Sequence, residues 1–176
     1  MGLFERLFGG RPKSAAGMDE AQAVAARGDY ETALAIWGPL AHAGRAHAAN
    51  NIGACFAEGL GVARDMELAL RWLTIAAEAG DAVGQRNLAA LYFKGDGVEQ
   101  NDETALTWYR AAAEQGDPPA QDMLAWMLLE RGDRADFAEI LTLSRAAAEA
   151  GIAASSPSRA RRWSSTGASE AGGSIP

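Results

Sequence analysis

The sequence has 176 residues, of which 48% are hydrophobic and 22% charged, and its formal net charge is −7 at pH 7. This length and composition fit a single, moderately sized domain with tails, long enough to bury a continuous core. The negative charge argues against nucleic acid and anionic lipid as general partners, and one cysteine excludes an intrachain disulfide framework.

Residues 1–17 precede the first helical pattern. The apolar pairs Leu3-Phe4 and Leu7-Phe8 are separated by Glu5-Arg6, so the stretch lacks the uninterrupted apolar run of a signal peptide. We expect a flexible N-terminal segment. The alternative is that residues 1–8 form a short amphipathic turn that docks on a membrane surface or a partner.

Residues 18–42 predict an atypical first helix pair. A helix over 19–27 and a second over 31–43 are separated by the turn Gly28-Asp29-Tyr30. Pro39 falls inside the second helix and should bend it, because proline removes a backbone hydrogen bond. An atypical terminal unit is expected in a repeat array, where it serves as a cap.

Residues 43–78 and 79–114 are copies of each other. Gly44 and Gly80 are 36 residues apart, and the same spacing separates further pairs along the two stretches. These pairs are Gly59 and Gly95, Gly61 and Gly97, Val62 and Val98, Trp72 and Trp108, and Glu78 and Glu114. A fixed period of this size predicts a helical hairpin that is copied and stacked. A third copy at 115–149 matches at both ends but is one residue shorter in the middle.

Each copy contains the signals for two helices and the turn between them. Gly95 and Gly97 can take the left-handed conformation that ends a helix. Asn101 offers a side chain that caps the next helix, and Asp65 does the same one repeat earlier. Alanine-rich apolar positions at helical spacing complete an all-helical pattern.

These residues resemble the Sel1-like repeat family, relatives of the tetratricopeptide repeat. Asn51-Ile52-Gly53 through Gly80 and Asn87-Leu88-Ala89 through Gly116 follow the family pattern almost position by position. The third copy departs from it, because Glu130-Arg131-Gly132-Asp133 replaces the Gly-x-Gly-Val turn. The resemblance implies an all-α solenoid over 18–151 that acts as a protein–protein interaction scaffold or adaptor and needs no cofactor.

The resemblance also implies where a partner binds. In such a solenoid the first helices of each pair line the concave side, and residues outside their packing register point into it. The candidate partner-binding residues are Asn50, Arg86, Phe93, Lys94, Asp122, Trp126, Leu129 and Glu130. Phe93, Trp126 and Leu129 would form an apolar patch for a protein partner with basic or apolar segments. The alternative for Trp126 is that it only closes the end of the solenoid.

Catalytic and metal-binding arrangements are not evident. His42 and His47 are five residues apart, which is not the spacing of a helical metal pair. Cys55 lies in an apolar register and is expected to be buried and inert. The sequence shows no nucleophile–base pair, so we expect no enzyme. The lack of paired cysteines favours a reducing, cytoplasmic location.

Residues 152–176 are rich in serine and glycine, and we expect disorder there. Arg159, Arg161, Arg162 and Trp163 form a basic cluster that is too short to indicate nucleic-acid binding. Residues 19–151 contain 21 acids and 10 bases, a net charge of −11, whereas each tail carries +2. An acidic body of this kind repels nucleic acid and attracts basic protein segments.

The end of the array leaves an apolar helix side without a predicted neighbour. Ser155-Ser156-Pro157-Ser158 stands where a further helix should begin, after a helix that carries Ile140, Leu141, Leu143 and Ala147. A partner, a second copy of the chain, or the tail folding back through Trp163 would have to cover this side. We expect self-association at high concentration.

A second function fits the sequence as an alternative to the scaffold. The chain would then be a regulatory or assembly subunit, held at a membrane or cell-envelope complex by its N-terminal amphipathic segment.

Overall fold

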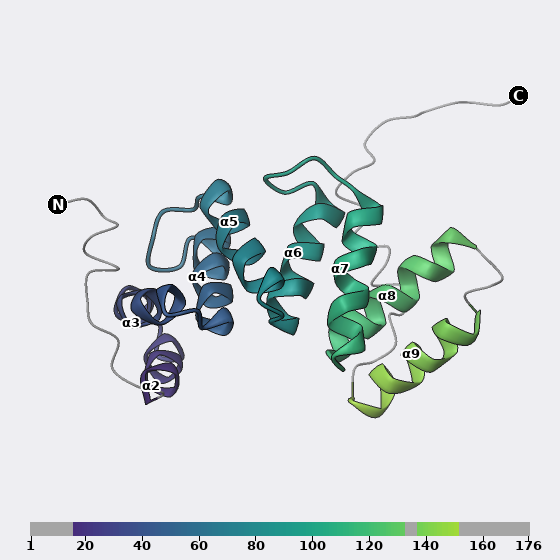
Figure 1. Ribbon diagram of the computed structural model, residues 1–176, viewed down its shortest axis with the longest axis horizontal. Helices are drawn as coiled ribbons and strands as arrows, with labels where there is room; N and C mark the ends of the chain where they lie inside the picture. The colour runs from purple at the N-terminus through teal and green to yellow at the C-terminus, as the bar shows by residue number, and fades with distance from the viewer. Residues whose placement is uncertain (1–15, 133–136, 152–176) are drawn as a thin grey trace, which may run out of the picture. The chain divides into compact units, whose positions relative to one another are not determined.

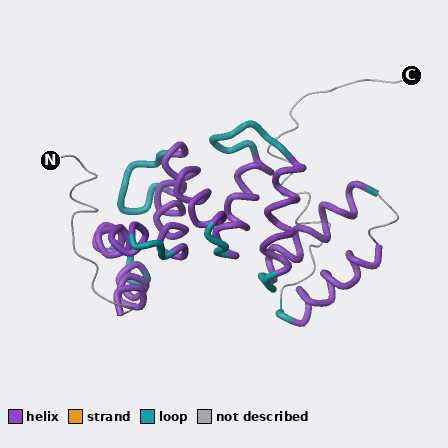
Figure 2. The backbone as a smooth tube through the Cα atoms, in the orientation of Figure 1, coloured by secondary structure: helices purple, strands orange, loops and turns teal. Residues whose placement is uncertain are grey.

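The computed structural model describes residues 16–132 and 137–151, and within these ranges it consists of helices joined by loops and turns, as Figures 1 and 2 show. The helices are α2 (Ala16–Ala25), α3 (Tyr30–His42), α4 (Ala46–Glu58), α5 (Met66–Glu78), α6 (Ala82–Lys94), α7 (Asp102–Glu114), α8 (Pro118–Arg131) and α9 (Phe137–Glu149). The predicted all-α repeat fold is confirmed. Expectations for residues 1–15, 133–136 and 152–176 lie outside the described ranges.

Four of the described helices, α3, α5, α6 and α7, begin where a polar side chain caps them. Asn101 Oδ1 accepts a hydrogen bond from the backbone N–H of Thr104 at 2.9 Å, and Asp65 Oδ1 accepts one from Leu68 at 3.0 Å. Both predicted caps are therefore confirmed. They satisfy backbone donors that the first turn of a helix leaves without a partner.

The first helix pair begins and ends differently from the prediction. Asp29 caps α3 by accepting from the backbone N–H of Thr32, so Tyr30 is the first helical residue rather than part of the turn. The preceding helix, α2, begins at Ala16 and ends at Ala25, instead of spanning 19–27. Its early start is explained by packing, because a Cβ on Gly17 would lie 3.4 Å from Leu40 Cδ1 of α3.

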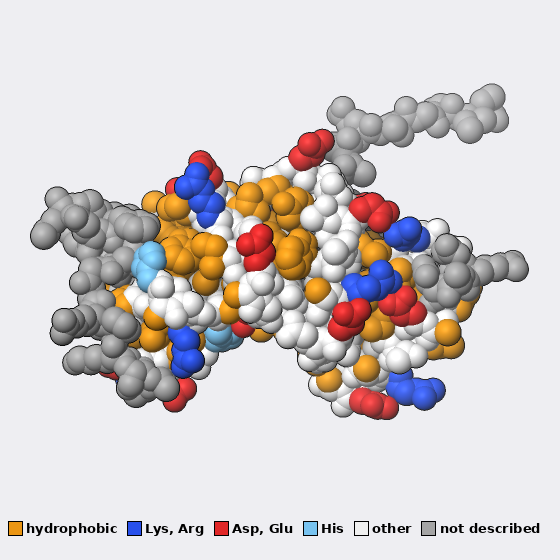
Figure 3. Space-filling view, viewed as in Figure 1, with side chains coloured by type: hydrophobic (Ala, Val, Ile, Leu, Met, Phe, Trp, Pro, Cys, Tyr) orange, Lys and Arg blue, Asp and Glu red, His pale blue; other side chains and the backbone are white. Residues whose placement is uncertain are grey.

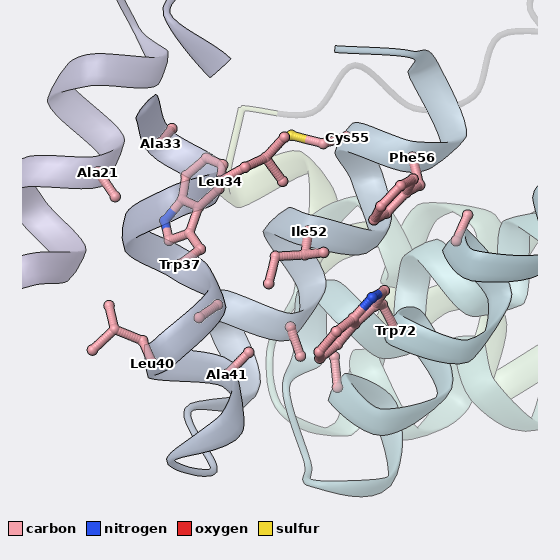
Figure 4. Packing of buried hydrophobic residues seen from close by; sticks show 14 of the residues in the cluster. Ala21, Ala33, Leu34, Trp37, Leu40, Ala41, Ile52, Cys55, Phe56 and Trp72 are labelled. Carbon is pink, nitrogen blue, oxygen red and sulfur yellow. The ribbon is translucent and has the colours of Figure 1, made fainter. Parts of the chain in front are cut away.

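The chain divides into two compact units, residues 1–117 and 118–176. In the first unit, α2 packs on α3, α4 on α5 and α6 on α7, and these pairs stack through α3–α4 and α5–α6 contacts. Figure 4 shows Trp37 of α3, Ile52 and Phe56 of α4 and Trp72 of α5 packed in one cluster. The stack thus builds a continuous core from neighbouring repeats.

Glycines let the helices of this stack approach closely. A Cβ on Gly53 would lie 2.7 Å from Leu73 Cγ, and one on Gly84 would lie 2.7 Å from Ala76 Cβ. These distances are shorter than packed carbon atoms tolerate. Glycine at these two positions therefore sets the separation between α4 and α5 and between α5 and α6.

The turn inside each repeat contacts the repeat before it. Gly61 lies against the first residues of α3, where an added Cβ would be 2.7 Å from the backbone nitrogen of Glu31. Gly97 lies against α5 in the same way, with a Cβ only 2.6 Å from Met66 Cβ. Both glycines also have positive φ angles, 71° and 75°. The second glycine of the turn thus serves both the local conformation and the stacking.

The second unit is the hairpin of α8 and α9, which pack against each other. Leu124 and Leu128 of α8 are buried, whereas Ala147 is the buried residue of α9 among those described. Leu141 of α9 is 68% exposed and Phe137 is 53% exposed. One side of α9 is therefore apolar and open.

Candidate partner-binding surface

The first helices of the two full repeats lie together in the first unit, because α4 contacts α6 as well as its own partner α5. Equivalent positions 36 residues apart line this side of the two helices. We call it the first-helix face: Ala54, Ala57 and Glu58 of α4, and Arg86, Ala90, Phe93 and Lys94 of α6. The alanines, Arg86 and Phe93 are half-buried, and Glu58 and Lys94 are exposed.

This face combines apolar area with opposite charges. Phe93 stands one repeat after Ala57, and Lys94 one repeat after Glu58. Across the broader surface in Figure 3, hydrophobic side chains gather over α4, α5 and α6, with charged side chains between them. An aromatic ring among small side chains offers contact area at low entropic cost.

Asn50 does not lie on the open surface where the sequence placed it. It is only 3% exposed, its Nδ2 donates to Asn51 Oδ1 at 3.2 Å, and its Oδ1 accepts from Asn87 Nδ2 at 2.8 Å. Asn50 and Asn87 are 37 residues apart, one more than the repeat period. The exposed position predicted for Asn50 differs from the structure because its hydrogen-bond partner, Asn87, comes from the next repeat. Asn50 therefore joins two first helices, as a buried amide must find partners.

Arg86 is held by an ion pair within the stack. Its Nη1 lies 2.8 Å from Asp117 Oδ2, and Asp117 is largely buried at the start of the next first helix. One repeat earlier, His47 Nδ1 lies 3.1 Å from Asp81 Oδ1, while Asp81 Oδ2 accepts from the backbone of Gly84. A basic residue of one first helix thus contacts the aspartate that precedes the next. Arg86 has a structural partner as well as a place on the first-helix face.

The second unit carries the other four predicted residues on α8. Leu129 and Glu130 are exposed and Trp126 is half-buried, whereas Asp122 is 8% exposed. Asp122 was predicted as a surface contact, but its side chain is buried. The sequence analysis did not predict that Phe137 is exposed. The equivalent residues of the earlier repeats are Met66 and Asp102, and neither indicates an exposed aromatic side chain at this position.

Two titratable groups of the described core, Cys55 and Tyr109, have pKa values raised by burial. Cys55 is buried, as predicted, and burial raises the pKa of its thiol to about 11, so it is protonated at neutral pH. Burial also raises the pKa of Tyr109 to about 12, against a smaller lowering by Arg86. Within 16–132 and 137–151, His, Cys, Asp and Glu form no group of three suited to a metal ion. None of the described helices is long and apolar enough to cross a membrane.

Two successive pairs of 13-residue helices, α4–α5 and α6–α7, stacked through close glycine contacts, define a helical-repeat protein of the solenoid class. The particular repeat is identified by sequence: residues 46–81 and 82–117 each match the Sel1 repeat, so the chain contains two Sel1 repeats. The resemblance stated from the sequence is thereby confirmed. Sel1-repeat proteins generally mediate protein–protein interactions.

Two solved structures share the fold. A Sel1 repeat protein from Oxalobacter formigenes has a TM-score of 0.70 and 33% sequence identity, over 75% of this chain and 55% of that chain. The protein c5321, a protective antigen present in uropathogenic Escherichia coli strains displaying an SLR fold, has a TM-score of 0.67 and 25% identity. That match covers 87% of this chain and 38% of that chain. The present chain therefore spans about half or less of each relative. None of the curated proteins compared matches it.

Proposed function

We propose that this chain is a scaffold or adaptor that binds a segment of a partner protein on the first-helix face. The observation that carries the proposal is Phe93, a half-buried aromatic side chain on α6, the helix that contacts α4. Aromatic anchors in such settings contribute most of the binding energy in protein interfaces. The scaffold role of the Sel1 repeat supports the same function.

The partner segment is apolar at its centre and carries basic residues. Phe93 calls for an apolar side chain, and exposed Glu58 offers a contact for a cation. Residues 19–151 carry a net charge of −11, which steers basic segments toward the body and repels nucleic acid. Lys94 adds a donor for a carboxylate beside the anchor, so the partner segment has mixed charge rather than basic residues alone.

The setting of this function is a reducing compartment, the cytoplasm. One cysteine occurs in the sequence, and it is buried in the core of the first unit. Tethering to a membrane or cell-envelope complex through residues 1–8 has no supporting observation among the described residues, and we do not propose it. Comparing cell fractions of the full chain with those of a Leu3→Ser/Phe4→Ser/Leu7→Ser/Phe8→Ser variant tests the location directly.

Photo-crosslinking tests the proposed surface and identifies the partner in one experiment. A benzophenone amino acid replaces Phe93 in one variant and Ile75 in another. Ile75 is the matched control, because it is an apolar residue of α5 that is 47% exposed and lies outside the first-helix face. We expect a protein adduct from position 93 that is absent from position 75. The same adducts from both positions, or adducts from position 75 alone, would contradict the proposal.

A further inference from the structure

The open side of α9 corresponds to a side that is covered in the earlier repeats. In α5, Leu70, Leu73 and Ala77 pack against Leu88 and Leu91 of the following first helix, α6. Counting along the repeats, the equivalent residues of α9 are Leu141, Ser144 and Ala148. Leu141 is 68% exposed and Ala148 is also exposed. The side of α9 that would receive a following segment is therefore present and uncovered by the described residues.

The chain leaves α9 through the same turn that precedes α4 and α6, which cover the second helices before them. Gly44, Gly80 and Gly116 have φ angles of 84°, 85° and 83°, and Gly151 has a φ of 79°. In all four turns the glycine N–H donates to the carbonyl three residues earlier, at 2.9 to 3.0 Å. After the first three glycines the chain continues into α4, α6 and α8. The turn at Gly151 thus has the geometry that precedes α4 and α6, the two helices that pack back on the second helix before them.

The following segment is long enough to pack back on α9. Trp163 comes 12 residues after Gly151, and Leu141 comes 10 residues before it. Ten residues of helix span about 15 Å, whereas 12 extended residues reach about 40 Å.

We propose that residues 152–165 bind the exposed side of α9 in the same molecule, with Trp163 over Leu141. The segment would then cover the end of the array, in place of a further repeat. Charge favours this occupant, because Arg159, Arg161 and Arg162 would meet an acidic body that includes exposed Glu149 on α9. A second copy of the chain would bring the same net charge of −7 and gain less from electrostatics. The sequence alone favoured that second copy, and the turn at Gly151 favours the chain's own tail.

Fluorine NMR of the full chain, labelled with fluorotryptophan, tests the contact. The Trp163 resonance is assigned by its loss in Trp163→Phe, and its solvent exposure is measured by the shift between light and heavy water. We expect Trp163 to be shielded in the full chain and solvent-exposed in Leu141→Asp. The matched control is Ile75→Asp, which also places a charge at an exposed apolar residue and should leave Trp163 shielded. Helical content by circular dichroism checks that each variant is folded.

Sedimentation equilibrium separates the other occupants. We expect the full chain to be monomeric at micromolar concentration, and Trp163→Ser to self-associate more strongly because the apolar side is uncovered. A full chain that dimerises, with Leu141→Asp dissolving the dimer and Trp163 exposed throughout, would show that a second copy covers α9. A monomeric full chain with Trp163 fully exposed would show that this side is left open or reserved for another protein. Either result overturns the proposal.

Discussion

Gly97 shows how much structure a single residue controls in this fold. Its φ of 75° is strained for any residue with a side chain, and a Cβ would lie 2.6 Å from Met66 Cβ of the preceding repeat. Gly80 has a similar φ of 85°, but a Cβ there would meet nothing within 4 Å. Comparing substitutions at the two glycines therefore separates the energetic cost of backbone strain from the cost of crowding between repeats.

We expect Gly97→Ala to lower the free energy of unfolding by more than Gly80→Ala. The strain term is about 1 kcal/mol for both, and crowding adds about 1–3 kcal/mol at position 97. Chemical denaturation of both variants measures the difference. Equal losses would mean that the turn does not pack on α5 as closely as described.

Tyr109 gives the protein a dependence on alkaline pH. Burial raises its pKa from 10.0 to about 12, so the folded state favours the neutral phenol. The resulting stabilisation is complete below pH 10 and is lost as the pH rises toward 12. Because the shift is about two pKa units and each unit corresponds to about 1.4 kcal/mol, we expect a total loss of about 3 kcal/mol.

The control for this prediction is a tyrosine elsewhere in the same repeat. Tyr109→Phe should flatten the alkaline decline in the free energy of unfolding, and Tyr92→Phe, at a half-buried position of α6, should retain most of it. Denaturant titrations between pH 9 and 12 make the comparison. An unchanged decline in Tyr109→Phe would show that another group causes it.

At the scale of the helices, small residues decide how closely the pairs pack. Ala112 of α7 is completely buried, and a leucine there would need space that the packed helices lack. We expect Ala112→Leu to cost about 1–3 kcal/mol in the free energy of unfolding. Ala35→Leu, at an exposed position of α3, should cost little. Thermal melts of the two variants that coincide with the parent would contradict the packing of α7.

The sequence predicted the elements best where the repeat supplied two independent copies. The caps Asp65 and Asn101, which begin α5 and α7, follow from matching signals 36 residues apart. The start of α2 could not be predicted, because it depends on the packing of Gly17 against Leu40. Local pattern cannot report a contact made by a distant helix.

The candidate surface was predictable only in part, for the same reason. The position of Phe93 on the first-helix face follows from helical spacing, whereas the burial of Asn50 depends on Asn87 of the next repeat. The ion pair of Arg86 with Asp117 also joins different repeats, 31 residues apart. Residues that look exposed within one repeat are therefore held by contacts with the next repeat. The sequence of a single repeat does not reveal such contacts.

At the scale of the whole molecule, the chain is a helical-repeat protein, and its proposed function is to bind a partner protein. The second unit contributes its own candidate, Trp126 on α8, which is half-buried. If it contacts the partner, Trp126→Ala should weaken binding by about 1–4 kcal/mol with little change in the midpoint of unfolding. If it only packs within the second unit, the same variant lowers the unfolding midpoint and leaves the affinity unchanged.

The affinity of Phe93→Ala for the partner identified by crosslinking tests the proposed function most directly. Calorimetry would compare this variant with the parent and with Ile75→Ala, which removes an apolar side chain of 47% exposure outside the first-helix face. We expect Phe93→Ala to weaken binding by about 1–4 kcal/mol and Ile75→Ala to leave it within about 0.5 kcal/mol. An unchanged dissociation constant for Phe93→Ala, in a variant that melts like the parent, would contradict binding on this face.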